Sequence, residues 1–195
     1  MAITINGNGT ITGVSTGGLP DGCVDSDTLA SPLASQGITM IDSWRLTTDT
    51  GNAPTSLTSN WERTDTVVPA LKGTGLTESS GVFTFPQTGM YLILCHFLAD
   101  VGDDDGACNV DIRVSTNSTT TYDDTNFVRT TMTTQGNKGT AGVHQGLYGS
   151  YVLDVESVST TRLAFRANSF AGNSELKGAT DENQSYFQVI RLGDT

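Results

Sequence analysis

Apolar and polar positions alternate in some predicted β-strands of this chain and not in others. In segment 108–115 the apolar residues fall at every second position, so that Asp111 and Arg113 lie opposite the apolar face. Segment 162–167 has the same pattern. Both strands are therefore predicted to bury one face and to expose the other to water.

Segment 89–99 departs from this alternation, because both of its faces are apolar. One face carries Tyr91, Ile93, Cys95 and Phe97; the other carries Leu92, Leu94 and Leu98, with His96 as the polar exception. Segments 147–155 and 186–192 are also apolar on both sides, though more weakly. One sheet is thus predicted to expose its outer face to water, and a second sheet is predicted to have both faces buried from water.

A dry outer face needs a cover, and no helical period of useful length supplies one. Leaving each large apolar side chain in water rather than burying it costs roughly 1.5–3 kcal/mol, so we expect another copy of the chain to cover this face. His96 is interpreted as a hydrogen-bonded core or interface residue rather than a ligand. The residues predicted for the interface are Tyr91, Leu92, Ile93, Leu94, His96, Leu98, Tyr151, Leu153, Phe187 and Val189.

From Ile38 onward the pattern is all-β, with turn residues between short apolar segments. The fold class expected is an antiparallel β-sandwich occupying residues 38–195. The candidate strands are 38–47, 60–67, 80–86, 89–99, 108–115, 125–133, 145–156, 161–168 and 185–192.

Residues 1–37 differ from the rest, because they hold too few large apolar residues to form a core. Two β-like pieces, 3–5 and 10–12, flank an Asn-Gly turn, and a run rich in Gly and Pro follows. Such a segment becomes ordered by adding to a neighbour. It is interpreted as an extended anchor or inter-subunit arm, with a flexible tail as the alternative.

Charge excludes one class of partner. The net charge is −11, and only ten Lys and Arg are spread along the chain, whereas a nucleic-acid-binding surface needs them clustered. No run approaches the roughly 18 apolar residues of a membrane span, and the first residues lack the pattern of a secretory signal. We therefore expect neither nucleic-acid binding, nor membrane insertion, nor signal-directed export.

The three cysteines, Cys23, Cys95 and Cys108, make an odd number without a paired framework. Buried free thiols are the favoured interpretation. A disulfide between Cys95 and Cys108 is the alternative.

Candidate chemistry is sparse. The acidic run Asp103, Asp104 and Asp105 offers oxygen ligands suited to Ca²⁺, although a solvated hairpin tip is the favoured interpretation. The string 13–17 matches a G-x-S-x-G nucleophile motif but lacks the strand, turn and helix that such a nucleophile requires. No paired carboxylates fall on predicted rigid elements. The chain is therefore expected not to be an enzyme.

The segment FTFPQTGMYLILCHF resembles the F-x-x-P-x-x-G-x-Y-x-F signature of the jelly-roll heads of complement's first component and the tumour necrosis factor superfamily. Later segments, among them VDIRVSTN and SYFQVIRLG, follow the family's order, whereas the turn 158–161 departs from its pattern. The resemblance implies a sandwich of about ten strands and a compact homotrimer whose inner sheets meet at a three-fold axis. It also implies that calcium binding is possible and that copies of His96 could cluster on that axis.

The stretch TINGNGTITGVSTGGLPDG resembles the opening of tail-fibre and other virion proteins of tailed bacteriophages. This likeness implies a virion protein whose arm docks on other tail or capsid proteins and whose head could touch a host-surface glycan or protein. A capsid decoration (cement) protein at local three-folds and a lectin-like or cytokine-like head outside any virus are the alternatives. The residues assigned to particle attachment are Ile3, Ile5, Ile11, Leu19 and Pro20.

Overall fold

The computed structural model describes residues 4–5, 11–12, 37–65, 71–102, 105–118, 128–135 and 143–195. The chain divides into two compact units, residues 1–36 and 37–195. In the first unit, β1 (Thr4–Ile5) pairs antiparallel with β2 (Ile11–Thr12). The two β-like pieces predicted for the arm therefore pair as a hairpin. Of the residues assigned to attachment, Ile5 lies opposite Ile11, while Ile3, Leu19 and Pro20 lie outside the described residues.

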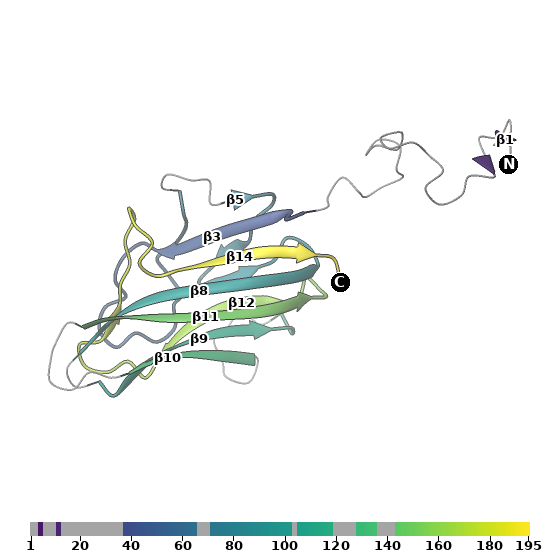
Figure 1. Ribbon diagram of the computed structural model, residues 1–195. Helices are drawn as coiled ribbons and strands as arrows, with labels where there is room; N and C mark the ends of the chain where they lie inside the picture. The colour runs from purple at the N-terminus through teal and green to yellow at the C-terminus, as the bar shows by residue number, and fades with distance from the viewer. Residues whose placement is uncertain are drawn as a thin grey trace. The chain divides into compact units, whose positions relative to one another are not determined.

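The second unit is built from β-strands, and the described residues contain no helix. Its strands form two antiparallel sheets that pack as a sandwich, as Figure 1 shows. The strands are β3 (Met40–Leu46), β4 (Trp61–Arg63), β5 (Leu71–Lys72), β6 (Thr77–Ser79), β7 (Val82–Thr84), β8 (Gly89–Val101), β9 (Ala107–Ser115), β10 (Val128–Gln135), β11 (Val143–Val155), β12 (Arg162–Asn168), β13 (Glu175–Leu176) and β14 (Tyr186–Gly193).

The strand order separates the two kinds of strand seen in the sequence. A five-stranded sheet runs β10-β9-β12-β7-β6, and a seven-stranded sheet runs β11-β8-β14-β3-β4, with β13 added to β8 and β5 added to β3. The three segments that are apolar on both sides become β8, β11 and β14, which lie side by side in the seven-stranded sheet (Figure 1). The two one-sided segments become β9 and β12, neighbours in the other sheet. The predicted division into two sheets is confirmed.

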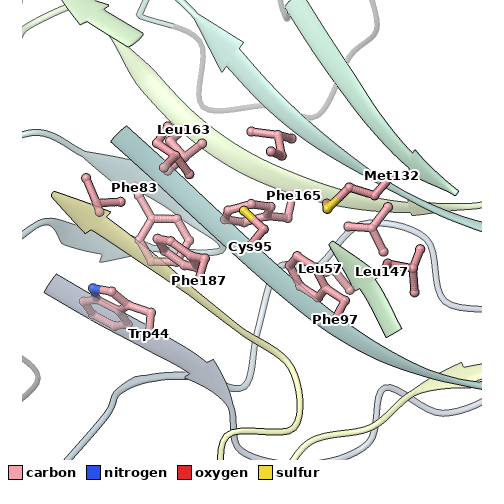
Figure 2. Close-up of a cluster of buried hydrophobic side chains, with 14 of the residues drawn as sticks. Trp44, Leu57, Phe83, Cys95, Phe97, Met132, Leu147, Leu163, Phe165 and Phe187 are labelled. Atoms are coloured by element: carbon pink, nitrogen blue, oxygen red, sulfur yellow. The ribbon is translucent and has the colours of Figure 1, made fainter. Parts of the chain in front are cut away.

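The core lies between the sheets and is dominated by aromatic rings. Phe165 and Phe187, from opposite sheets, have ring centroids 4.6 Å apart, and Phe83 lies 4.8 Å from Phe187. Trp61 packs against Phe83, Phe187 and Phe97 at ring-centroid distances of 5.4–6.4 Å. Figure 2 shows these phenylalanines gathered between the sheets. Edge-on packing of this kind adds to the burial energy that holds the sheets together.

Strand β9 corrects one expectation about the five-stranded sheet. Asp111 and Arg113 were predicted to face water, yet their exposed fractions are 0% and 1%. Asp111 accepts a hydrogen bond of 2.7 Å from Thr131 on the neighbouring β10, and its carboxylate lies 3.7 Å from the Arg113 guanidinium. Buried charges are tolerated when they are paired in this way. The alternation correctly placed Asp111 and Arg113 on the face of β9 opposite its apolar residues, but it did not predict that this face is buried.

Both described cysteines are free and buried, so the favoured buried-thiol interpretation is confirmed for them and the alternative, a disulfide between Cys95 and Cys108, is wrong. Burial raises the pKa of Cys95. Burial and the Asp105 carboxylate together raise the pKa of Cys108 to about 12. Cys23 lies outside the described residues.

Candidate functional site: the outer face of the seven-stranded sheet

The outer face of the seven-stranded sheet is the surface opposite the core on β11, β8, β14 and β3. The pairing registers align its side chains in three rows across these four strands. The aromatic row contains Tyr148, His96, Tyr186 and Arg45; the middle row contains Ser150, Leu94, Gln188 and Ser43; the aliphatic row contains Val152, Leu92, Ile190 and Ile41.

Apolar side chains are left in water on this face. Val152 is 55% exposed, Tyr148 is 74% exposed and Leu94 is 36% exposed. Leu92 and Ile190 beside them are only partly buried. Contiguous apolar side chains at the surface of a folded chain mark a contact site for another molecule.

Charge is nearly absent from the three rows, although the chain carries 21 acidic residues. Arg45 is the charged member of the rows, and it is held by Glu62 at 2.7 Å and Asp65 at 2.9 Å. Gln188 in the middle row donates a hydrogen bond of 3.0 Å to Ser43, so its amide is engaged within the sheet. Depletion of charge at the centre of a patch is the compositional mark of a protein interface.

A hollow of about 480 Å³ opens between the aromatic and middle rows. His96 stands in its wall with Tyr148 on one side and Tyr186 on the other, at ring-centroid distances of 4.6 Å and 5.4 Å. Burial lowers the pKa of His96, and a hydrogen bond with the backbone of Gln184 offsets only part of this effect. The imidazole is therefore held toward its neutral form.

The structure divides the predicted interface residues between the two faces. Leu92, Leu94, His96 and Leu98 lie on the outer face, where the prediction needs them. Tyr91, Ile93, Phe187 and Val189 are 0% exposed and Leu153 is 6% exposed, because they fill the sandwich core. Tyr151 also faces inward and packs against the core. These six assignments are wrong for a surface contact, because each strand packs one of its two apolar faces against the core of its own domain.

Sequence reasoning missed several members of the face. Tyr148, Val152, Tyr186 and Ile190 occupy alternate positions of β11 and β14, on the side opposite the core residues. Their alternation was present in the sequence. The register that aligns them with Leu92 and His96 depends on pairing between segments far apart in the chain, which no local pattern carries.

The calcium prediction can be tested only at Asp105, because residues 103–104 lie outside the described part of the chain. The Asp105 side chain is 3% exposed and accepts hydrogen bonds from the Ala171 N–H at 2.8 Å and the Cys108 thiol at 3.3 Å. Burial acts to raise its pKa, but hydrogen bonds from Ser174, Ala171 and Cys108 prevail and lower it. Asp105 thus braces the loop before β9 against residues 171–174 instead of standing at a solvated tip.

Among the described residues, His, Cys, Asp and Glu side chains form no group of three that could hold a metal ion. In the same part of the chain, no helix is long and apolar enough to span a membrane.

Comparison with known proteins identifies the fold. No family model and no curated protein matches the sequence. Among solved structures, Eiger TNF from S. frugiperda superposes with a TM-score of 0.56 at 15% identity, over 82% of this chain and 96% of its own. Murine APRIL superposes with a TM-score of 0.55 at 12% identity, over 78% of this chain and 98% of its own. At such identities the likeness concerns the fold alone, and the described strands form a jelly roll like that of these tumour-necrosis-factor-type proteins.

Proposed function

We propose that the chain is a non-enzymatic binding or display head that works as a homotrimer, with the outer faces of three seven-stranded sheets packed around a common axis. The observation that carries this proposal is the outer face itself, with its exposed Val152, Tyr148 and Leu94 and with three rows whose charged member, Arg45, is paired. A second copy of the same face is the natural cover, because an apolar surface satisfies an apolar surface.

The choice of three copies rests on the resemblance of the sequence to a family whose members form trimers through this sheet. The fold likeness to Eiger TNF and murine APRIL is consistent with that choice. In such an arrangement the loops at the ends of the sandwich stay free for a target.

For the biological setting we propose a bacteriophage virion component, a tail fibre or head fibre held to the particle by residues 1–36. The support for this setting is the sequence of the arm, and the structural neighbours give it none. A cytokine-like head that binds a receptor outside any virus is the second candidate, favoured by the fold likeness to APRIL and TNF. Mass spectrometry of purified virus particles separates the two: the virion proposal expects a fixed copy number, a multiple of three, and absence from the particle refutes it. Hundreds of copies would indicate a capsid decoration protein.

A single substitution tests the trimer. Leu94→Asp places a charge at the centre of the outer face without touching the core, so we expect a folded monomer. The matched control is Thr77→Asp, which adds the same charge at an exposed strand position of the other sheet. Sedimentation velocity should find monomers for Leu94→Asp and trimers for Thr77→Asp and the unmodified chain, with unchanged β-sheet circular dichroism in all three. A stable trimer of Leu94→Asp would refute the proposed face.

A further inference from the structure

His96 is the ionisable side chain at the centre of the outer face, and its burial outweighs the hydrogen bond with the Gln184 backbone that favours its charged form. We propose that protonation of His96 dissociates the trimer, so that mildly acidic solution switches assembly off. This inference rests on the proposed function, since it concerns the regulation of the same face.

The groups packed against His96 come from three strands. Tyr148 of β11 and Tyr186 of β14 flank its ring, and Leu94 and Leu98 precede and follow it on the same face of β8. None of these neighbours is a carboxylate, so the imidazolium would gain no opposite charge within the row.

Beyond this first layer, the charged groups are already paired. Arg45 of β3 ends the aromatic row, separated from His96 by Tyr186, and it is paired with Glu62 and Asp65. Glu62 lies on β4, on the side of β3 away from β14, so its carboxylate is engaged with Arg45 rather than with His96. At the loop before β14, the side chain of Gln184 donates a hydrogen bond to Glu182, which is exposed to solvent.

Toward the other end of β8 lies Asp100, four positions along the strand, which places it about 13 Å from His96. Asp100 lies 3.7 Å from the His144 imidazole, and Glu175 opposite it is bonded to Lys177. Screening by water and salt weakens an attraction over that distance. The nearest acidic side chains on this face therefore cannot hold His96 in its charged form.

Trimer formation would remove His96 from the water that still reaches it. In the free chain water still reaches His96, so protonation costs less there than in the trimer, where the side chain would be fully buried. The assembled state thus has the lower His96 pKa and binds fewer protons. Assembly is therefore favoured above the His96 pKa of the free chain, which burial already lowers from the ordinary value of about 6.5, and it is lost as the pH falls through that pKa. With three copies of His96 per trimer, the dissociation constant should rise by up to about a thousandfold per pH unit in that range.

Sedimentation equilibrium of the full chain at about pH 8 and about pH 5 tests this inference. The unmodified chain should be trimeric at the higher pH and dissociate at the lower. His96→Phe keeps a flat ring between the two tyrosines but cannot ionise, and should remain trimeric at both values. His144→Gln removes the chain's other histidine, on the same face, and should dissociate like the unmodified chain.

Each outcome decides between the claims. An unmodified chain that stays trimeric at the lower pH, or a His96→Phe variant that dissociates along with it, overturns the switch and leaves the proposed function standing. A monomer already present at the higher pH overturns both. If His96→Phe fails to fold, His96→Lys supplies the second test: a permanent charge should give a folded monomer even at the higher pH, and a trimeric His96→Lys would contradict the inference.

Discussion

At the scale of single residues, Asp42 is a buried carboxylate whose hydrogen-bond partners the sequence pattern does not predict. It is a charged residue between the apolar Ile41 and Trp44 of β3, and it is 0% exposed. Its carboxylate accepts hydrogen bonds from Trp44 Nε1 at 3.0 Å, from the Leu76 N–H at 2.7 Å and from Arg63 at 2.8 Å and 3.2 Å. The Arg63 guanidinium in turn lies 4.7 Å from the centre of the Trp44 ring. Alternation cannot predict such a network, because its donors come from three separate segments.

Replacing Asp42 should therefore destabilise the head. Asp42→Ala would leave buried donors without an acceptor, and we expect a loss of about 2–4 kcal/mol of unfolding free energy, moderated by the partial exposure of Arg63. Urea denaturation followed by tryptophan fluorescence measures this loss. The control Asp181→Ala removes an exposed carboxylate from the loop before β14 and should change the stability by less than about 0.5 kcal/mol. Equal effects of the two substitutions would refute the buried network.

The two described cysteines lead to a second prediction at this scale. The pKa of Cys108 is raised to about 12, and burial also raises that of Cys95, so neither forms the reactive thiolate near neutral pH. In a Cys23→Ser variant, iodoacetamide should label neither thiol until the protein is unfolded. Labelling of either residue in the native protein, detected by mass spectrometry, would show that the core opens or that the burial is wrong.

At the scale of elements, β8 shows what pattern alone can predict. Its apolar residues on both faces predicted a strand covered on two sides, yet they could not indicate which face belongs to the core. The structure places Tyr91, Ile93 and Phe97 inward and Leu92 and Leu94 outward. Both faces have similar hydrophobicity, so the choice depends on how β8 pairs with β11 and β14, which is a property of the whole fold.

Short elements escaped prediction for a different reason. Segment 80–86 was expected to be one strand, but it begins in a turn, where Ser80 and Gly81 have φ angles of 52° and 75°. Two consecutive positive φ values form the tight connection of a hairpin, and β6 and β7 pair across it. The two-residue β13 was not predicted at all, because two residues are too few to show a period.

The alternation along β8 predicts opposite responses from adjacent residues. Ile93→Ala should lower the unfolding free energy by about 2–5 kcal/mol at every protein concentration, because it opens a cavity in the core. Leu92→Ala should lower the melting temperature mainly at high concentration, where assembly adds to stability. Calorimetry over a hundredfold concentration range, on the order of that needed to shift a trimer equilibrium, measures both effects. Identical concentration dependence in the two variants would argue against an interface on the outer face.

At the scale of the whole molecule, an acidic chain keeps one broad surface almost free of charge. The net charge of −11 would keep separate chains apart if it were spread evenly. The three rows of the outer face instead gather apolar side chains around His96. Glu62, Asp65 and Asp100 are engaged in ion pairs, and the exposed Asp154 lies beyond Val152 at the edge of the aliphatic row. We attribute this separation of apolar from charged side chains to trimer formation.

The division of the chain into two units predicts that the head is independent of the arm. A chain beginning at Gly37 should fold with unchanged stability and form the same trimer, because the strands of both sheets lie within residues 37–195. Denaturation and sedimentation of this truncated chain check the expectation. Loss of the trimer on truncation would make residues 1–36 part of the assembly rather than an attachment segment.

The mass of the unmodified full chain in solution tests the central claim most directly. Sedimentation equilibrium at micromolar concentration and slightly alkaline pH should give three times the chain mass of 20.5 kDa. A well-behaved species of 20.5 kDa under the same conditions, with Leu92 and Leu94 left in water, would contradict the account.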